Sequence, residues 1–314
     1  MVDLSQSGKR ASRMDKYYWG IDLGGTKVEC AVISREDDRC VLRERIPSHA
    51  ERGYAHILNR IQFLVARCAE TLGCYPSEIG FGTPGALDPV TGLMKNCNST
   101  ALNGQPLHRD LADLLKVRVR LANDANCLAL AETHLGVVRQ VNPNAEVVFA
   151  IIMGTGVGAG IVVNGKVIHG LHGIAGEWGH NVIEPAGREC YCGKRGCLET
   201  VISGQGLEIA YHQRTGVQRS LSEIMQLSQH GEADAMLIQD RLMRYFGLAV
   251  AQIINVLDPD VIVVGGGVGN IDLLYDTGRQ AIMPHLFNPV LNTAIVKPIL
   301  GDSAGVFGAA MLVK

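Results

Sequence analysis

The chain lacks several features that would place it at once in a specialised class of protein. Its 314 residues carry 29 basic and 31 acidic side chains, a formal net charge of −2, without a long run of one sign. This balance does not favour a nucleic acid or a membrane surface as partner. The longest uncharged apolar stretch, Val147 to Val163, is interrupted by glycines and is too short to span a bilayer. The start of the chain lacks the apolar segment of a secretory signal. We therefore expect a cytoplasmic protein with a small-molecule ligand, and a flexible extension over residues 1–15.

A disulfide framework is also not expected. The nine cysteines are odd in number and the chain shows no export signal. Six are scattered among apolar neighbours and are expected to be small buried hydrophobic residues. The other three, Cys190, Cys192 and Cys197, lie close together behind His180. That cluster needs a separate explanation.

The length and the hydrophobic fraction of 47% indicate a compact protein of two domains. The segment "YYWGIDLGGTKVECAVIS" predicts two strands joined by a Gly-Gly-Thr turn, and "VVFAIIMGTGVGAGIVV" repeats that plan further along the chain. Helices are predicted over 55–72, which has a one-sided apolar face, and over 240–256. We expect an N-terminal α/β domain over 16–130, with 300–314 as a candidate return to it, and a C-terminal α/β domain over 131–299.

The two glycine turns are candidate phosphate-binding elements. Successive N–H groups of glycines can converge on an anion, and Thr26, Lys27 and Thr155 would add donors or positive charge. The second turn also matches G-x-G-x-x-A, but a strand pattern follows it where a dinucleotide-binding site needs a helix. A tight hairpin that needs glycine for its geometry alone is the structural alternative.

Two acidic residues occupy positions suited to phosphoryl transfer. Asp22 lies inside the first strand, where it could hold a hydrated magnesium ion or accept hydrogen bonds from its own turn. Asn123 and Asp124 stand between a strand and a helix, where either could be a simple N-cap. Asp124 also fits a base that accepts the proton of an attacking sugar hydroxyl, with Asn123 orienting the hydroxyls. The long loop before them offers the amides of Asn98 and Asn103 for sugar recognition.

The cysteine cluster predicts a structural zinc site. His180, Cys190, Cys192 and Cys197 follow the spacing H-x9-C-x-C-x4-C and supply four ligands, which fill a tetrahedral zinc and leave no open position for chemistry. The alternative is a set of free thiols. Zinc would order the segment 180–199 and thereby fix Glu177 and Glu199, either of which could otherwise be solvated surface charge.

Together these motifs resemble the ROK family of sugar kinases and repressors from Tyr17 to Lys314. The matching segments are "GIDLGGTK", "GTGVGAG", "GEWGH" and "CYCGKRGCLE". The resemblance implies an actin-like (ribonuclease H-like) ATPase fold, with two α/β domains around a cleft that binds ATP and magnesium, and a homodimer.

The resemblance also assigns residues. Asp124 matches the catalytic base. The positions that match sugar contacts are Gly85, Asn98, Asn123, Glu177, His180 and Glu199. The positions that match nucleotide binding are Asp22, Gly24, Gly25, Thr26, Lys27, Gly154, Thr155, Gly156, Gly265, Gly266 and Gly267. His180 would bind zinc through one ring nitrogen and donate to the sugar through the other.

Within the family, "KNCNSTALNGQPLHRDL" and "VRLANDANCLALAE" look most like fructokinases that also accept mannose. We therefore expect phosphorylation of fructose, with N-acetylglucosamine or glucose as alternative sugars. Ala101 departs from the bulky aromatic of related fructokinases and indicates a roomier pocket. A sugar-responsive repressor is the less favoured function, because about sixteen residues before the first strand are too few for a helix-turn-helix domain.

Overall fold

The structure is a computed structural model, and it describes residues 16–314. The expected extension over 1–15 lies outside the described residues. The chain divides into two compact units. The first unit runs to Gly136 and includes Gly165–Ile174 and Leu300–Lys314, and the second contains Val137–Asn164 and Ala175–Ile299. The segment Gly165–Ile174, which the sequence analysis placed in the second domain, is thus grouped with the first, where β10 (Lys166–Val167) contacts helix α4.

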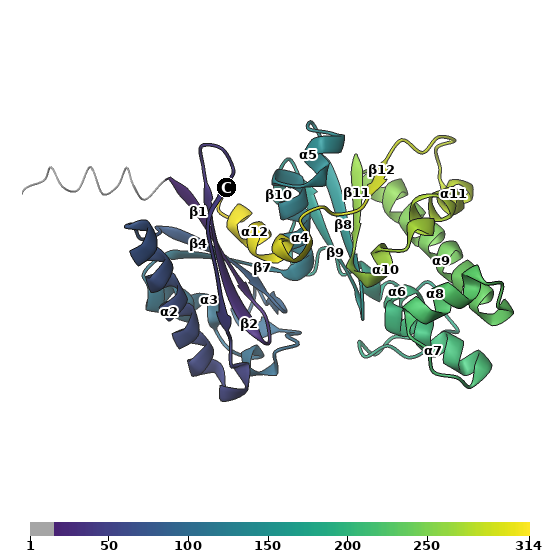
Figure 1. Ribbon diagram of the computed structural model, residues 1–314, viewed down its shortest axis with the longest axis horizontal. Helices are drawn as coiled ribbons and strands as arrows, with labels where there is room; N and C mark the ends of the chain where they lie inside the picture. The colour runs from purple at the N-terminus through teal and green to yellow at the C-terminus, as the bar shows by residue number, and fades with distance from the viewer. Residues whose placement is uncertain (1–15) are drawn as a thin grey trace, which may run out of the picture. The chain divides into compact units, whose positions relative to one another are not determined.

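The first unit is built on a five-stranded sheet with the order β3-β2-β1-β4-β7 (Figure 1). The strands are β1 (Tyr17–Leu23), β2 (Lys27–Ser34), β3 (Cys40–Pro47), β4 (Glu78–Thr83) and β7 (Arg118–Asn123). The first three form the antiparallel part that the glycine turn predicts, and β4 and β7 run parallel to β1. A small ribbon of β5 (Ala86–Leu87) and β6 (Met94–Lys95) precedes α3.

Helices cover both faces of this sheet (Figure 1). On one face lie α2 (Tyr54–Leu72) and α3 (Leu107–Leu115), whose apolar side chains join the main core of the unit. On the other lie α4 (Asp124–His134) and α12 (Ala304–Met311), which contact each other. The last helix approaches closely because Gly20 and Gly80 have no side chain. A Cβ at Gly80 would lie 1.9 Å from the carbonyl oxygen of Ala309.

The second unit repeats the plan with strands in the order β9-β8-β11-β12. Strand β8 (Val147–Met153) pairs antiparallel with β9 (Val157–Val163), and β11 (Val261–Gly265) and β12 (Ala294–Val296) follow in parallel. The strand that begins at Val157 agrees with the period-two pattern and excludes a dinucleotide-binding helix there. The long helix α9 (Ala233–Leu257) contains the helix predicted over 240–256 and supplies much of the core.

Shorter elements complete the second unit. They are α5 (Val137–Val141), η3 (Trp178–His180), α6 (Leu198–Ile202), α7 (Gly204–Thr215), α8 (Leu221–Gln229), α10 (Gly266–Gly269), η4 (Asp272–Tyr275), α11 (Thr277–Ile282) and η5 (Met283–His285). The first unit also has η1 (Ala50–Arg52), η2 (Thr100–Leu102) and η6 (Gly301–Ser303). Within residues 16–314, no helix has the length and apolar character needed to cross a membrane.

Candidate active site and metal centre

In the first unit, the polar residues singled out from the sequence gather where the parallel strands end. Asp22 of β1 is in register with Gly82 of β4, and Thr83 at the end of β4 is in register with Asn123 of β7. Parallel strands present their carboxyl ends at one edge of a sheet, and ligands of open α/β sheets bind at that edge. Asp22, Asn123 and Asp124 therefore come together although about 100 residues separate them in the chain.

Asp22 is a partly buried carboxylate. Its oxygens lie so close to Gly82 and Gly305 that a Cβ on either glycine would come within 3.0 Å of them. Desolvation, and after it the nearby charge of Glu29, raises the pKa of Asp22 to about 6. No carboxylate–cation pair within the described residues neutralises Asp22. An oxygen donor in such a position fits a hydrated magnesium ion, which is usually bound by one or two carboxylates and several waters.

Asn123 and Asp124 start helix α4, as expected. The side chain of Asn123 is the N-cap and accepts a hydrogen bond of 2.9 Å from the N–H of Asn126. Oδ1 of Asp124 accepts a hydrogen bond of 2.8 Å from the N–H of Ala125, whereas Oδ2 has no side-chain partner among residues 16–314. Although the residue as a whole is exposed, the surrounding protein desolvates the carboxyl group and raises its pKa. A rigid carboxylate with a raised pKa is suited to accept a proton at neutral pH.

The first glycine turn, Gly24 to Lys27, is held by its own backbone. The N–H of Gly24 donates to the carbonyl of Lys27 at 2.9 Å, and the buried hydroxyl of Ser48 donates to the carbonyl of Gly25 at 2.7 Å. Gly25 and Thr26 at the tip are exposed. The turn is therefore fixed from behind and presents its tip to a ligand, an arrangement that suits phosphate binding.

The loop before β7 uses some of the expected residues for its own structure. Both polar atoms of the Asn103 amide bond the backbone of Cys97, at 2.8 and 3.1 Å, so this amide supports the loop. Asn98, in contrast, is exposed, and its backbone N–H donates to the carbonyl of Pro84. A Cβ at Gly85 would come 2.5 Å from the sulfur of Cys97, which explains the glycine by packing as well.

Gly85 and Asn123 both line a cavity of about 610 Å³ in the first unit, together with His108, Asn126 and His169. The side-chain oxygen of Asn126 is buried and has no hydrogen-bond partner within the described part of the chain. Asp124 and Asn98 are not among the residues that line this cavity. The structure therefore brings Asn123 and Gly85 to a common cavity and leaves Asp124 and Asn98 outside it.

In the second unit the two glycine turns assigned to the nucleotide lie side by side. Gly265 at the end of β11 is in register with Ile152 of β8, and a Cβ on Gly266 would lie 2.3 Å from the carbonyl of Met153. Gly266 has a φ of 83°, a backbone conformation that favours glycine. Gly154 and Gly267 have open space where a side chain would be. Exposed Thr155 forms the tip of the first of these turns.

Glu199 contacts the glycine turn at Gly154–Gly156, a contact that the sequence analysis missed. Its carboxylate accepts a hydrogen bond of 3.0 Å from the N–H of Val157, and a Cβ on Gly156 would come within 2.5 Å of the same oxygen. A side chain at position 156 would therefore displace the carboxylate of Glu199 from this contact. Glu199 stands at the start of α6, directly after the cysteine cluster, and so connects the cluster to the turn.

The side chains of His180, Cys190, Cys192 and Cys197 converge. One ligand atom from each lies within 4.8 Å of every other. The sulfur of Cys190 is 3.6 Å from Nδ1 of His180, and the sulfurs of Cys192 and Cys197 are 3.5 Å apart. Four ligands at the usual zinc distances occupy a tetrahedron with edges of about 3.5–3.8 Å. The donor set and its spacing therefore fit one zinc ion with no position left for water.

Backbone hydrogen bonds hold the segment 180–199 in a tight fold. The N–H of Gly196 donates to Arg188 at 2.8 Å, and its carbonyl accepts from Ile183 and Glu184. Gly196 has a φ of 69°, and a Cβ there would lie 1.6 Å from the carbonyl oxygen of Glu184. Only glycine fits this position, which explains its place in the motif.

With Nδ1 of His180 directed to the cysteines, Nε2 is the nitrogen left for other contacts. It lies 3.0 Å from the hydroxyl of Tyr191 and 3.9 Å from a carboxylate oxygen of Glu177. Tyr191 is 82% exposed and was not singled out from the sequence, because a tyrosine between two cysteines carries no distinctive signal. Glu177 is also accessible, in a segment otherwise fixed by buried Trp178.

Two α/β units with matching sheets and glycine turns define the actin-like ATPase fold, the class that the sequence analysis predicted. The sequence profile of the ROK family matches residues 18–314, and the chain belongs to that family.

Individual relatives agree with this assignment. The chain is 37% identical over 306 residues to an N-acetyl-D-glucosamine kinase of Haemophilus influenzae, covering 94% of this chain and 98% of that protein. It is 36% identical over 307 residues to a protein of the same name from Histophilus somni, with the same coverage. Among solved structures, a ROK hexokinase from Thermus thermophilus is similar with a TM-score of 0.85 and 31% identity, covering 94% of this chain and 97% of the other. A ROK glucokinase from Streptomyces griseus, in complex with glucose and AMPPNP, has a TM-score of 0.71 and 26% identity, covering 94% and 98%.

Proposed function

We propose that this chain phosphorylates N-acetyl-D-glucosamine with ATP. At the coarser level it is an ATP-dependent sugar kinase of the ROK family. The observation that carries the finer proposal is the name shared by relatives that are 34–37% identical over 94% of the chain. The sequence analysis favoured fructose, with mannose as a second substrate, and these relatives support its alternative better. The roomier pocket expected from Ala101 agrees with a sugar that carries an N-acetyl group.

Asp124 is proposed as the catalytic base. Its second carboxylate oxygen accepts the proton of the attacking sugar hydroxyl. The hydroxyl oxygen bonds to the γ-phosphorus of ATP while the bond between that phosphorus and ADP breaks. The desolvation that raises its pKa makes it a stronger base than an exposed aspartate. Asn123 is held at the N-cap beside it and orients the hydroxyls.

The remaining site residues are proposed to bind the two substrates. Gly85, Asn98, Glu177, His180 and Glu199 contact the sugar. The turns that begin at Gly24, Gly154 and Gly265 bind the nucleotide, and Asp22 holds magnesium through water. Magnesium would offset the charge that develops on the transferred phosphoryl group. Zinc at His180 and the three cysteines is structural.

A panel of N-acetylglucosamine, glucose, mannose and fructose in a coupled ADP-release assay tests the sugar. We expect the highest kcat/KM for N-acetylglucosamine. A preference for fructose would return the assignment to the first expectation, and the absence of ADP release with every sugar would refute the kinase.

The variant Asp124→Asn tests the base. It retains the shape of the side chain and cannot accept the proton, so we expect sugar binding by calorimetry to persist while kcat falls by at least about a hundredfold. Asp113→Asn, on the exposed face of α3, is the matched control and should leave kcat unchanged. A nearly normal kcat in Asp124→Asn would remove this residue from its role.

A further inference from the structure

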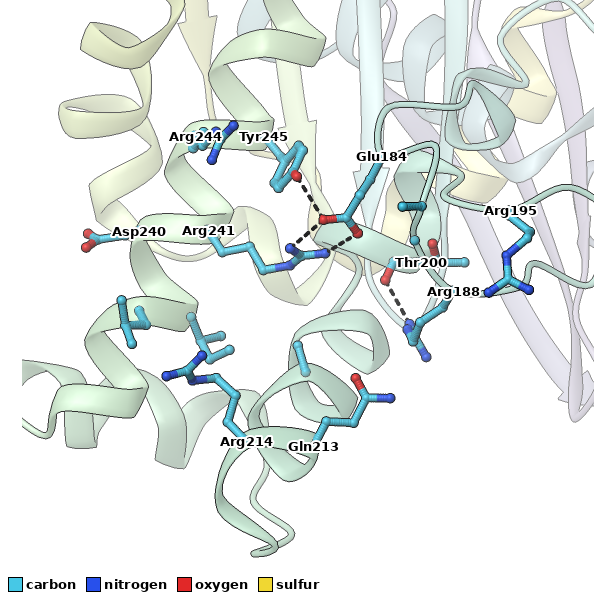
Figure 2. Close-up of a pocket in the computed structure, with 15 residues that line it drawn as sticks. Glu184, Arg188, Arg195, Thr200, Gln213, Arg214, Asp240, Arg241, Arg244 and Tyr245 are labelled. Atoms are coloured by element: carbon cyan, nitrogen blue, oxygen red, sulfur yellow. Dashed lines mark hydrogen bonds and ion pairs between the residues drawn. The ribbon is translucent and has the colours of Figure 1, made fainter.

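Glu184 connects the metal-binding segment, residues 180–199, to helix α9 (Figure 2). Both oxygens of its carboxylate take part. Arg241 donates to Oε1 at 2.8 Å and to Oε2 at 2.7 Å, and the hydroxyl of Tyr245 donates to Oε1 at 2.8 Å. Arg241 and Tyr245 are four residues apart and therefore lie on one face of the helix, from which Figure 2 shows both side chains directed toward Glu184. Two parallel hydrogen bonds between a guanidinium and a carboxylate fix both distance and orientation.

The helix offers Glu184 a firm point of attachment. Leu242 and Phe246, which follow Arg241 and Tyr245 in the chain, are fully buried in the core of the second unit. The side chains of Arg241 and Glu184 are only 27% and 25% exposed, so water competes little for their hydrogen bonds. The hydrogen bonds from Arg241 also lower the pKa of Glu184, and its carboxylate is therefore charged at neutral pH.

A cavity of about 750 Å³ makes this contact important for the position of the segment. Its wall is formed by residues of the metal-binding segment, of α7 and of α9, and includes Glu184, Arg241 and Tyr245. Atoms that face a cavity have few packing partners on that side. Along this side, the hydrogen bonds of Glu184 therefore do more than close packing to determine how the segment lies against α9.

Backbone pairing connects Glu184 to the rest of the segment. Two antiparallel arms, residues 181–184 and 196–198, hydrogen-bond to each other. The N–H of Glu184 donates to the carbonyl of Gly196 at 3.1 Å. A Cβ at Gly196 would lie 1.6 Å from the carbonyl oxygen of Glu184, so the two arms touch at this point. A displacement of Glu184 would therefore displace both arms.

We propose that Arg241 is a positioning residue for sugar binding and that it acts through Glu184. The inference rests on the proposed function, in which His180 and Glu199 contact the sugar. His180 directly precedes one arm of the segment, and Glu199 directly follows the other. Zinc at the four ligands would hold the ligand side chains relative to one another. Arg241 instead holds the segment relative to α9, and the two contributions are distinct.

The variant Arg241→Met tests the proposal, because it removes the charged donors and keeps an unbranched side chain. We expect the KM for N-acetylglucosamine to rise by about tenfold, while kcat changes by less than about twofold, since the proposed base, Asp124, belongs to the first unit. Arg241→Lys retains one charged donor and should recover part of the loss. Arg214→Met is the matched control. Arg214 lines the same cavity but pairs with Asp234, outside the metal-binding segment, and its loss should leave KM unchanged.

Amide hydrogen exchange gives a readout that needs no kinase activity. Residues 182–198 should exchange at least about tenfold faster in Arg241→Met than in the unchanged protein or in Arg214→Met, because local opening becomes easier. The zinc content of all three proteins, measured by mass spectrometry, should be equal. A lower zinc content in Arg241→Met would overturn the proposal, because Arg241 would then act on metal retention. Should Arg241→Met fail to fold, Arg241→Lys supplies the same comparison, since it keeps a positive charge beside Glu184.

A double variant tests whether Arg241 acts through Glu184. If it does, Arg241→Met combined with Glu184→Gln should raise the sugar KM no more than the worse of the two single variants does. Increases in KM that multiply in the double variant would overturn this route, and an unchanged KM with unchanged exchange in Arg241→Met would overturn the proposal itself. If the protein phosphorylated no sugar, the proposed function would fail, while the exchange measurement would still decide whether Arg241 positions the segment.

Discussion

Replacing Asp22 with asparagine should stabilise the first unit in a pH-dependent way. The carboxyl has a pKa of about 6 in the folded protein, against an ordinary value of 3.8, chiefly because burial desolvates its charge. The folded state thus holds this proton more tightly than the unfolded state. Stability that is present below pH 4 is therefore lost as the pH rises toward 6 and beyond. One pKa unit corresponds to about 1.4 kcal/mol, so ionisation of Asp22 costs on the order of 3 kcal/mol.

Asparagine cannot ionise, so the variant does not incur this cost. We compare the free energy of unfolding of the variant with that of the unchanged protein. The difference should be smallest near pH 4 and about 3 kcal/mol larger at pH 7 and above. The two tryptophans make the measurement specific, because buried Trp19 lies in the first unit and buried Trp178 in the second. Urea unfolding in a Trp178→Phe background would report on the first unit through Trp19 fluorescence.

The control for this series is Asp113→Asn, an exposed carboxylate in the same unit. Its effect on stability should stay small at every pH, as is usual for surface substitutions. If the difference between Asp22→Asn and the unchanged protein were constant from pH 4 to pH 8, desolvation of Asp22 would not be the source of its effect. Magnesium should reduce the stability gap, because a cation near the carboxylate favours its charged form.

Two further predictions concern the metal centre and the turn beside it. Cys192→Ser should lower the zinc content, measured by mass spectrometry, below one ion per chain. It should also shift the unfolding of the second unit, followed by Trp178 fluorescence, to lower urea concentration, because structural zinc contributes folding free energy. Cys40→Ser, which changes another exposed cysteine, should have neither effect. Glu199→Gln retains an oxygen that can accept a hydrogen bond from the N–H of Val157. Its kcat/KM should therefore exceed that of Glu199→Ala by about tenfold. An equal loss of kcat/KM in both variants would show that this hydrogen bond does not matter.

Local patterns in the sequence were sufficient for much of the fold. The hairpins formed by β1 with β2 and by β8 with β9, and the helix after Asn123, follow from alternation, glycine turns and capping, which act over a few residues. The spacing of His180 and the cysteines likewise predicted a cluster that the structure brings together. These patterns could be recognised in the sequence because each is formed by residues that are close together in the chain.

Contacts between distant segments could not be read in this way. The hydrogen bond from Val157 to Glu199 joins residues 42 positions apart, and the pairing of Glu184 with Arg241 joins residues 57 apart. Neither has a local pattern, because each depends on how α6 and α9 pack against the sheet. For the same reason, the sequence could not show that the side chain of Asn103 bonds the backbone whereas Asn98 is exposed.

The position of the metal-binding segment explains why a zinc ion would matter to a reaction in which it takes no part. At its two ends the segment enters the core through Trp178 and Leu198, both at least 97% buried. Between them, Ile183 is partly buried against the core, but Val182 and Tyr191 are exposed, so the middle buries little apolar surface and needs another source of folding free energy. Zinc held by the four ligands, as proposed, would supply it, because zinc binding and ordering of the segment would occur together. The carboxylate of Glu199, one residue beyond Leu198, then acquires a fixed position at the second glycine turn. Loss of the metal should therefore act on sugar affinity and turnover through Glu199, and leave the first unit and its Asp124 intact.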